Sequence, residues 1–184
     1  MEYCLTINFD LFETIKVLSP WLLAIVVYVV WHWQKEKEVI ANEAKDILKL
    51  IDELKSSFAA VYVQYHLYVN NIKHFNEEYL QEARGENYKI SKDFLDKMKF
   101  LLTLIEDKKV YEIYKIISLN ETKFSATQLM FEGAEEDVEF LKTLSERIEK
   151  DLDQLKVKLV GYVMYKNRIR SRKKLFRFCF FSRD

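Results

Sequence analysis

The residues whose types and spacing could do chemistry are few in this 184-residue chain. His66, Asn70 and His74 recur every four residues and precede Glu77 and Glu78, which suggests a metal site. On a helix, however, the two histidines lie about 12 Å apart along the axis, too far to share one ion. The Glu-x-x-His pattern of di-iron helical proteins is missing as well. We therefore interpret this run as the polar face of an exposed helix.

Catalytic signatures are missing from the whole sequence. It has no phosphate-binding glycine loop, no Gly-x-Ser-x-Gly and no Cys-x-x-Cys, and three glycines are too few for most such loops. The two cysteines, Cys4 and Cys179, stand near opposite ends of the chain without metal-ligand spacing. The sequence predicts a protein that is not an enzyme and that needs no cofactor, metal or small-molecule substrate.

The C-terminal segment 166–184 is the sharpest candidate for binding. It holds eight Lys or Arg and one Asp, whereas the whole chain is neutral, so the residues before it are acidic overall. Aromatic rings can enter a lipid interface while basic groups meet anionic headgroups. The same mixture can stack on single-stranded nucleic acid, which we favour less, or dock on the acidic body. The residues predicted to bind anionic lipid or a partner are Arg168, Arg170, Arg172, Lys173, Lys174, Phe176, Arg177, Phe178, Phe180 and Phe181.

An apolar segment near the N-terminus is the first element that would position these groups. Eighteen uncharged residues separate Lys16 from Lys35, about 27 Å of helix, with tryptophans toward both ends. We predict a short extracytoplasmic or interfacial segment 1–18 and a transmembrane helix over 19–34, with Ser19 as its cap and Pro20 as its first residue. A start as early as residue 11 would give a full span. The predicted anchor residues are Trp21, Leu22, Leu23, Ile25, Val26, Val27, Val29, Val30, Trp31 and Trp33.

Two alternatives to an anchor also produce an apolar run near the N-terminus. A buried core helix has runs of similar length. A cleaved export signal is disfavoured because Glu2, Asp10 and Glu13 precede the run and no small-residue cleavage site follows it. Lysines are more frequent after the segment than before it, so the positive-inside rule places the N-terminus outside and the C-terminus in the cytoplasm.

The body, 35–165, shows apolar residues at alternating spacings of four and three. The first run extends from Ile40 to Tyr79, which predicts one long helix that ends near Gly85. Ser91 is then expected to cap a second helix, 118–122 to form a loop, and Ser125 to cap the last helix. The predicted seam residues are Ile40, Ile47, Ile51, Leu54, Phe58, Val61, Tyr65, Leu141, Ile148, Leu152, Leu155 and Leu159.

Two arrangements of these helices fit the pattern. Three helices could run out, back and out again. If 107–109 is a turn, the last helix instead runs antiparallel to the first and brings the C-terminal segment back toward the membrane. Matching helix lengths favours the second arrangement, while the lack of Gly or Pro at 107–109 favours the first. We predict the second, a cytoplasmic antiparallel helical bundle over 35–165.

The predicted fold class is all-α, a single N-terminal transmembrane helix that continues into a coiled coil or helical bundle. The leading hypothesis is a single-pass protein of the inner membrane that presents a cytoplasmic interaction or scaffold module and that self-associates or binds a protein partner. An oligomeric membrane effector, of the pore-forming, lysis, toxin or phage-exclusion kind, is the first alternative. A soluble helical nucleic-acid-binding protein is the second.

Overall fold

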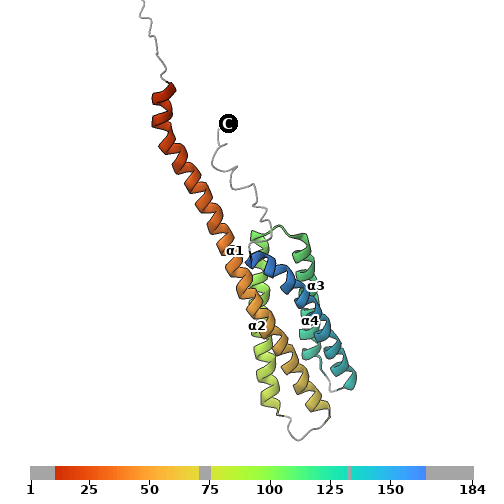
Figure 1. Cartoon of the computed structure of the whole chain (residues 1–184). Helices are drawn as coiled ribbons and strands as arrows, with labels where there is room; N and C mark the ends of the chain where they lie inside the picture. Colours follow the sequence, from red (N-terminus) through yellow and green to blue (C-terminus); the bar gives the residue numbers. More distant parts are fainter. Residues whose placement is uncertain (1–10, 71–75, 132–133, 165–184) are drawn as a thin grey trace, which may run out of the picture. The chain divides into compact units, whose positions relative to one another are not determined.

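A computed structural model describes residues 11–70, 76–131 and 134–164 of the chain. All the regular structure in these residues is helical (Figure 1). The four helices are α1 (Leu11–Val69), α2 (Glu77–Leu104), α3 (Lys108–Leu129) and α4 (Glu135–Val163). The predicted all-α class is therefore confirmed.

The chain divides into two compact units, 1–39 and 40–184, which we describe separately. The described part of the first unit is the N-terminal portion of α1. The second unit holds the rest of α1 together with α2, α3 and α4, and these helices share one set of buried apolar side chains, which we call the core. The core begins at Ile40, which is fully buried.

Contacts between helices in the second unit fix their directions. Lys156 Nζ donates to Asp52 at 2.7 Å and Lys55 Nζ to Asp153 at 2.7 Å, so α4 runs antiparallel to α1. The Asn87 side-chain amide donates to Ser57 Oγ at 2.9 Å, and Lys97 pairs with Asp46, so α2 is also antiparallel to α1. Figure 1 shows the C-terminal part of α1 beside α2, α3 and α4, with directions that alternate along the chain. The structure thus has the arrangement in which the last helix returns.

Residues at the alternating four-three spacing of α1 and α4 fill the core. A helix turns once per 3.6 residues, so this spacing keeps one stripe facing the neighbouring helices. Phe58 of α1 meets Phe124 of α3 edge to face, with ring centroids 4.7 Å apart. The buried seam positions are Ile40, Ala44, Ile47, Ile51, Leu54, Phe58, Val61 and Tyr65 in α1, and Val138, Leu141, Leu144, Ile148, Leu152, Leu155, Leu159 and Tyr162 in α4.

The first predicted helix end is wrong. α1 ends at Val69 and α2 begins at Glu77, so Gly85 lies inside α2 and Tyr79 is exposed. Asparagine side chains mark both ends of the break: Asn70 Nδ2 donates to the His66 carbonyl at 2.8 Å, and Asn76 caps α2 by accepting from the Glu78 N–H. Asparagine is common at helix ends because its short side chain can hydrogen-bond to nearby backbone groups.

Three more predicted boundaries fall inside helices. Ser91 is buried within α2, and 118–122 and Ser125 belong to α3. Ser125 caps no helix, because it lies inside α3, where its hydroxyl donates to the Glu121 carboxylate at 3.0 Å. Ile117 and Phe124, both buried, hold the polar stretch between them in the helix. Packing thus overrides the loop preference of Asn and Ser there.

The chain turns at Asp107, between α2 and α3, as the second predicted arrangement requires. Asp107 is the N-cap of α3, and its Oδ1 accepts from the N–H groups of Lys109 and Val110 at 2.9 and 3.2 Å. Its Oδ2 accepts from the Tyr162 hydroxyl at 2.9 Å. Burial, together with this hydrogen bond, raises the pKa of Tyr162. One carboxylate therefore holds the α2–α3 turn and the end of α4 together without any Gly or Pro.

Candidate membrane-spanning segment

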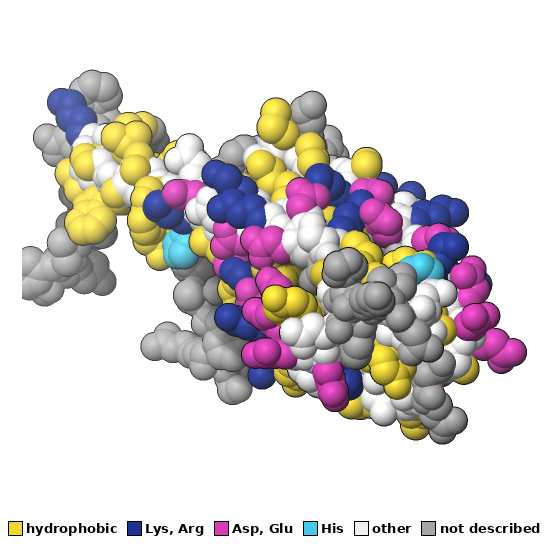
Figure 2. Space-filling model, turned by 90° about the horizontal axis from the view of Figure 1, so that it is seen from below, with side chains coloured by type: hydrophobic (Ala, Val, Ile, Leu, Met, Phe, Trp, Pro, Cys, Tyr) yellow, Lys and Arg dark blue, Asp and Glu magenta, His cyan; other side chains and the backbone are white. Residues whose placement is uncertain are grey.

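The N-terminal part of α1 exposes its apolar side chains on every side. By length and composition α1 could cross a membrane, and none of its most apolar window is buried. Trp21 is 70% exposed and Val26 57%. In Figure 2 hydrophobic side chains cover the segment at the left, whereas Lys, Arg, Asp and Glu intersperse over the rest of this face. A helix that is apolar all round needs an apolar environment.

The segment begins earlier than the predicted cap. Pro20 lies inside α1, so the prediction that Ser19 and Pro20 start the helix is wrong. Proline lacks the N–H that would donate to the carbonyl four residues earlier, which here belongs to Lys16. The Ser19 hydroxyl donates to that carbonyl oxygen instead, at 3.4 Å. Backbone groups freed by a proline are often satisfied by Ser in this way within membranes.

Aromatic and charged groups gather where the apolar run ends. The His32 ring meets Tyr28 and Trp31 edge on, with centroids 5.2 and 5.7 Å apart. Lys37 Nζ lies 3.7 Å from the centroid of the Trp33 ring, a cation–π contact. Rings that carry a polar atom prefer the headgroup layer of a bilayer. This end of the segment therefore has the composition of a membrane interface.

The predicted anchor residues that are large and apolar are all exposed. The predicted seam residues are buried by the chain's own helices, so a second copy of the chain is not needed to cover them. The ten predicted binding residues of the C-terminal segment, Arg168 to Phe181, lie outside the described residues. The structure therefore places the predicted anchor residues on the surface and the predicted seam residues in the core.

The histidine run does not gather ligands in the part of the chain that is described. His66 stacks on Tyr62 at 6.0 Å, and Asn70 Nδ2 also lies 3.3 Å from His66 Nδ1. His74 lies outside the described residues. Among those that are described, no three His, Cys, Asp or Glu side chains are placed to hold an ion.

Several polar side chains inside the core were missed from the sequence. Ser57 and Asn87 are buried against each other, and Glu121 and Gln128 take core positions of α3. The Tyr65 hydroxyl donates to the backbone carbonyl oxygen of Gln128 at 3.1 Å, and burial raises the pKa of Tyr65. Asn87 lies at the core spacing of α2 and was the signal in the sequence for these buried polar contacts, since polar core positions often fix helix register.

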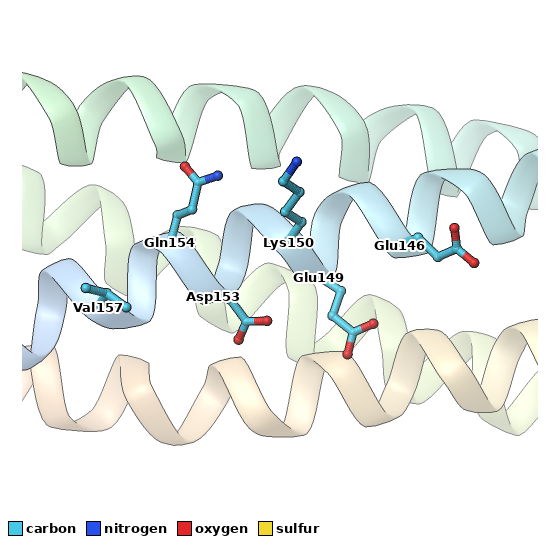
Figure 3. Close-up of a pocket in the computed structure, with 6 residues that line it drawn as sticks. All are labelled: Glu146, Glu149, Lys150, Asp153, Gln154 and Val157. Carbon is cyan, nitrogen blue, oxygen red and sulfur yellow. The ribbon is translucent and has the colours of Figure 1, made fainter.

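A shallow hollow lies on the outward face of α4 (Figure 3). Its lining residues are Glu146, Glu149, Lys150, Asp153, Gln154 and Val157. They splay to both sides of the helix, and Glu149 and Asp153 also pair with Lys55 of α1. Open, charged and built on one helix, the hollow lacks the enclosed apolar walls of a small-molecule site.

No protein-family model matches the chain, and comparisons with curated proteins and with solved structures also give no match.

Proposed function

We propose that this chain is a single-pass membrane protein in which the apolar segment of α1 anchors a helical interaction module. The observation that carries the proposal is that no residue of the most apolar part of that segment is buried. A core helix of a soluble protein would be mostly buried, and exposed apolar patches of this size mark contact with lipid or another protein. The tryptophans and lysines at its ends suit the headgroup layers.

The orientation that we propose has the N-terminus outside and the core in the cytoplasm. Lys16 alone stands before the segment, whereas Lys35, Lys37, Lys45 and Lys49 follow it closely. Basic residues near the ends of a span are retained on the cytoplasmic side.

The core is proposed to act as the interaction module, through its outer faces. Its inner seam is already filled, so a partner protein or a second copy would meet side chains that remain exposed. Large apolar side chains exposed on different helices include Tyr88, Leu129, Phe140 and Val157. Aromatic and aliphatic side chains of this kind are typical anchors of protein interfaces.

Fractionation and cysteine labelling test the anchor and its orientation. The protein should stay in the membrane pellet after a carbonate wash, and recovery in the supernatant would overturn the proposal. A membrane-impermeant maleimide should label Cys4 but not Cys179 in intact cells. Labelling of Cys179 alone would reverse the orientation.

An oligomeric membrane effector is the competing hypothesis, and it predicts a different phenotype. Expression of an effector should depolarise the membrane and arrest growth, as followed with a potential-sensitive dye. The interaction module that we propose should be tolerated at the same expression level.

A further inference from the structure

We propose that the outer face of α3 pairs with the same face of a second copy of the chain, as a parallel two-stranded coiled coil. The inference deepens the proposed function, because it names the surface and the partner of the interaction module. The surface is one row of exposed residues along α3 and its C-cap, which we call the outer stripe: Glu112, Ile116, Leu119, Lys123, Ala126 and Met130.

The outer stripe lies on the side of α3 that faces away from the core. A helix turns once per 3.6 residues, so Leu119, two residues from both Ile117 and Glu121, points about half a turn away from these two buried residues. Ile116, Leu119 and Met130 are 48%, 57% and 78% exposed. The core therefore leaves the apolar side chains of this stripe uncovered.

The distribution of polar residues in α3 is the reverse of that in its neighbours. At positions opposite to the core, the neighbours expose charged side chains, Glu78, Glu82, Lys89 and Asp96 in α2 and Glu139, Glu146, Lys150 and Asp153 in α4. α3 instead buries Glu121 and Gln128 and exposes Ile116, Leu119 and Met130. A helix that packs on one side only places its apolar residues on that side. The outer stripe of α3 thus has the composition of a second packing face.

The spacing of the outer stripe is that of a coiled-coil seam. Its residues follow one another at intervals of four, three, four, three and four. Ile116 falls on an a position and Leu119 on a d position, the combination that favours parallel pairs. Lys123 falls on the next a position, where a single polar residue fixes the register and the number of strands at a cost in stability. A second copy in the same register offers the matching seam.

The charges beside the seam also suit a second copy. In a parallel pair the g position of one helix meets the following e position of its partner, so Lys115 would meet Asn120 of the second copy. Over residues 113–131, Lys115 and Lys123 are the exposed charged side chains, while Glu121 is buried. Equal charges therefore face each other only at Lys123, whose long stem lets its ammonium group reach water.

The outer stripe is short, so a shared membrane matters for the pairing. It runs for about 27 Å along one helix, which offers fewer residues than the about 20 to 30 a side of stable interfaces. Two copies anchored in one membrane meet at a raised effective concentration. At this step the inference rests on the proposed function, and we expect pairing in vesicles at protein concentrations too low for pairing in detergent.

Disulfide crosslinking of the full chain in phosphatidylcholine vesicles tests the proposal. In a Cys4→Ser/Cys179→Ser background, Ala126→Cys places one thiol on a d position, which in a parallel pair faces the same position of the second copy. Mild oxidation should yield a disulfide-linked dimer on a non-reducing gel. The matched control is Lys89→Cys on the outer face of α2, which is equally exposed to random collision and should stay monomeric.

Further substitutions in the Ala126→Cys chain test the seam itself. Leu119→Asp should lower the association constant about tenfold or more, because each copy would bring an unpaired carboxylate into the seam. Lys123→Leu should raise it, since the polar a position is then apolar. A Lys123→Glu chain should crosslink to the chain that keeps Lys123 more than either does to itself, because position 123 faces position 123 in this register. Circular dichroism should show an intact core in each case.

The outcomes separate this inference from the proposed function. If the chain does not enter vesicles, the anchor fails, and crosslinking at position 126 in solution still decides the pairing. Equal crosslinking at positions 126 and 89, or no effect of Leu119→Asp, would overturn the inference. Crosslinking that appears only after removal of 165–184 would overturn it too, because the chain's own C-terminal segment would then cover the stripe.

Discussion

Two arginines at the centre of the apolar segment test whether α1 spans a membrane. The change is Ile25→Arg/Val26→Arg, and both side chains are more than half exposed in the fold, so the core should keep its structure. The nine Leu, Ile and Val residues between Lys16 and Lys35 each favour insertion by about 0.3 to 0.6 kcal/mol, together about 3 to 5 kcal/mol. Each central arginine opposes insertion by about 2.5 to 3.5 kcal/mol.

One arginine should therefore bring insertion close to balance, and two should abolish it. The assay is the fraction of protein in the membrane pellet after a carbonate wash. The matched control, Leu129→Arg/Val157→Arg, places two arginines at core positions that are 79% and 74% exposed and should pellet like the natural protein. Retention of the double-arginine variant in the pellet would refute the transmembrane assignment, provided that circular dichroism shows an intact core.

Three substitutions test the core by denaturant unfolding in detergent. Gly85→Ala should raise the free energy of unfolding by about 0.5 to 1 kcal/mol, since an added Cβ meets nothing within 4 Å and the residue is helical. A lower free energy of unfolding would instead support the predicted helix end at Gly85. Ser57→Ala should cost about 1 to 3 kcal/mol by leaving the Asn87 amide buried without its partner, and an additional Asn87→Leu should recover most of it. Tyr162→Phe should cost about 1 kcal/mol at pH 7. Because the pKa of Tyr162 is raised above its unfolded value of about 10, the natural chain should lose stability as pH rises beyond 10, and the variant should lose less.

The long seams of α1 and α4 could be predicted from the sequence because nearly every core position in them is apolar. The end of α1 could not, since Ile72, Phe75 and Tyr79 continue the four-three spacing past the break. Asn70 and Asn76 carried the opposing signal, and their side-chain hydrogen bonds decide the boundary. Local capping thus outweighed periodicity at this point.

α3 was the least predictable helix, because its core face mixes apolar and polar residues. Glu121 and Gln128 occupy core positions there, so the apolar period is interrupted and the stretch around Asn120 resembles a loop. Ile117 and Phe124 keep it helical by packing against the other helices, a contribution that only tertiary structure supplies.

The apolar run of the candidate membrane segment could be predicted from the sequence, but the residue at which its helix begins could not. An uninterrupted apolar run is a signal that the sequence carries by itself. The start of the helix depended instead on whether Pro20 begins it or lies inside it. Pro20 lies inside the helix, and the Ser19 hydroxyl donates to the Lys16 carbonyl oxygen, which the proline cannot bind.

The pairing of the first helix with the last has a consequence for synthesis. Residues of α4 cover the α1 seam, and 94 residues must be added after Val69, the end of α1, before Val163, the end of α4, is made. At about 5 to 20 residues per second, the ribosome needs about 5 to 20 s to supply the missing helix. During that time the apolar seam of α1 has no permanent cover, whereas the N-terminal apolar segment has already emerged. Chains that stop before α4 should therefore aggregate or recruit chaperones, while membrane engagement by the N-terminal segment precedes closure of the core.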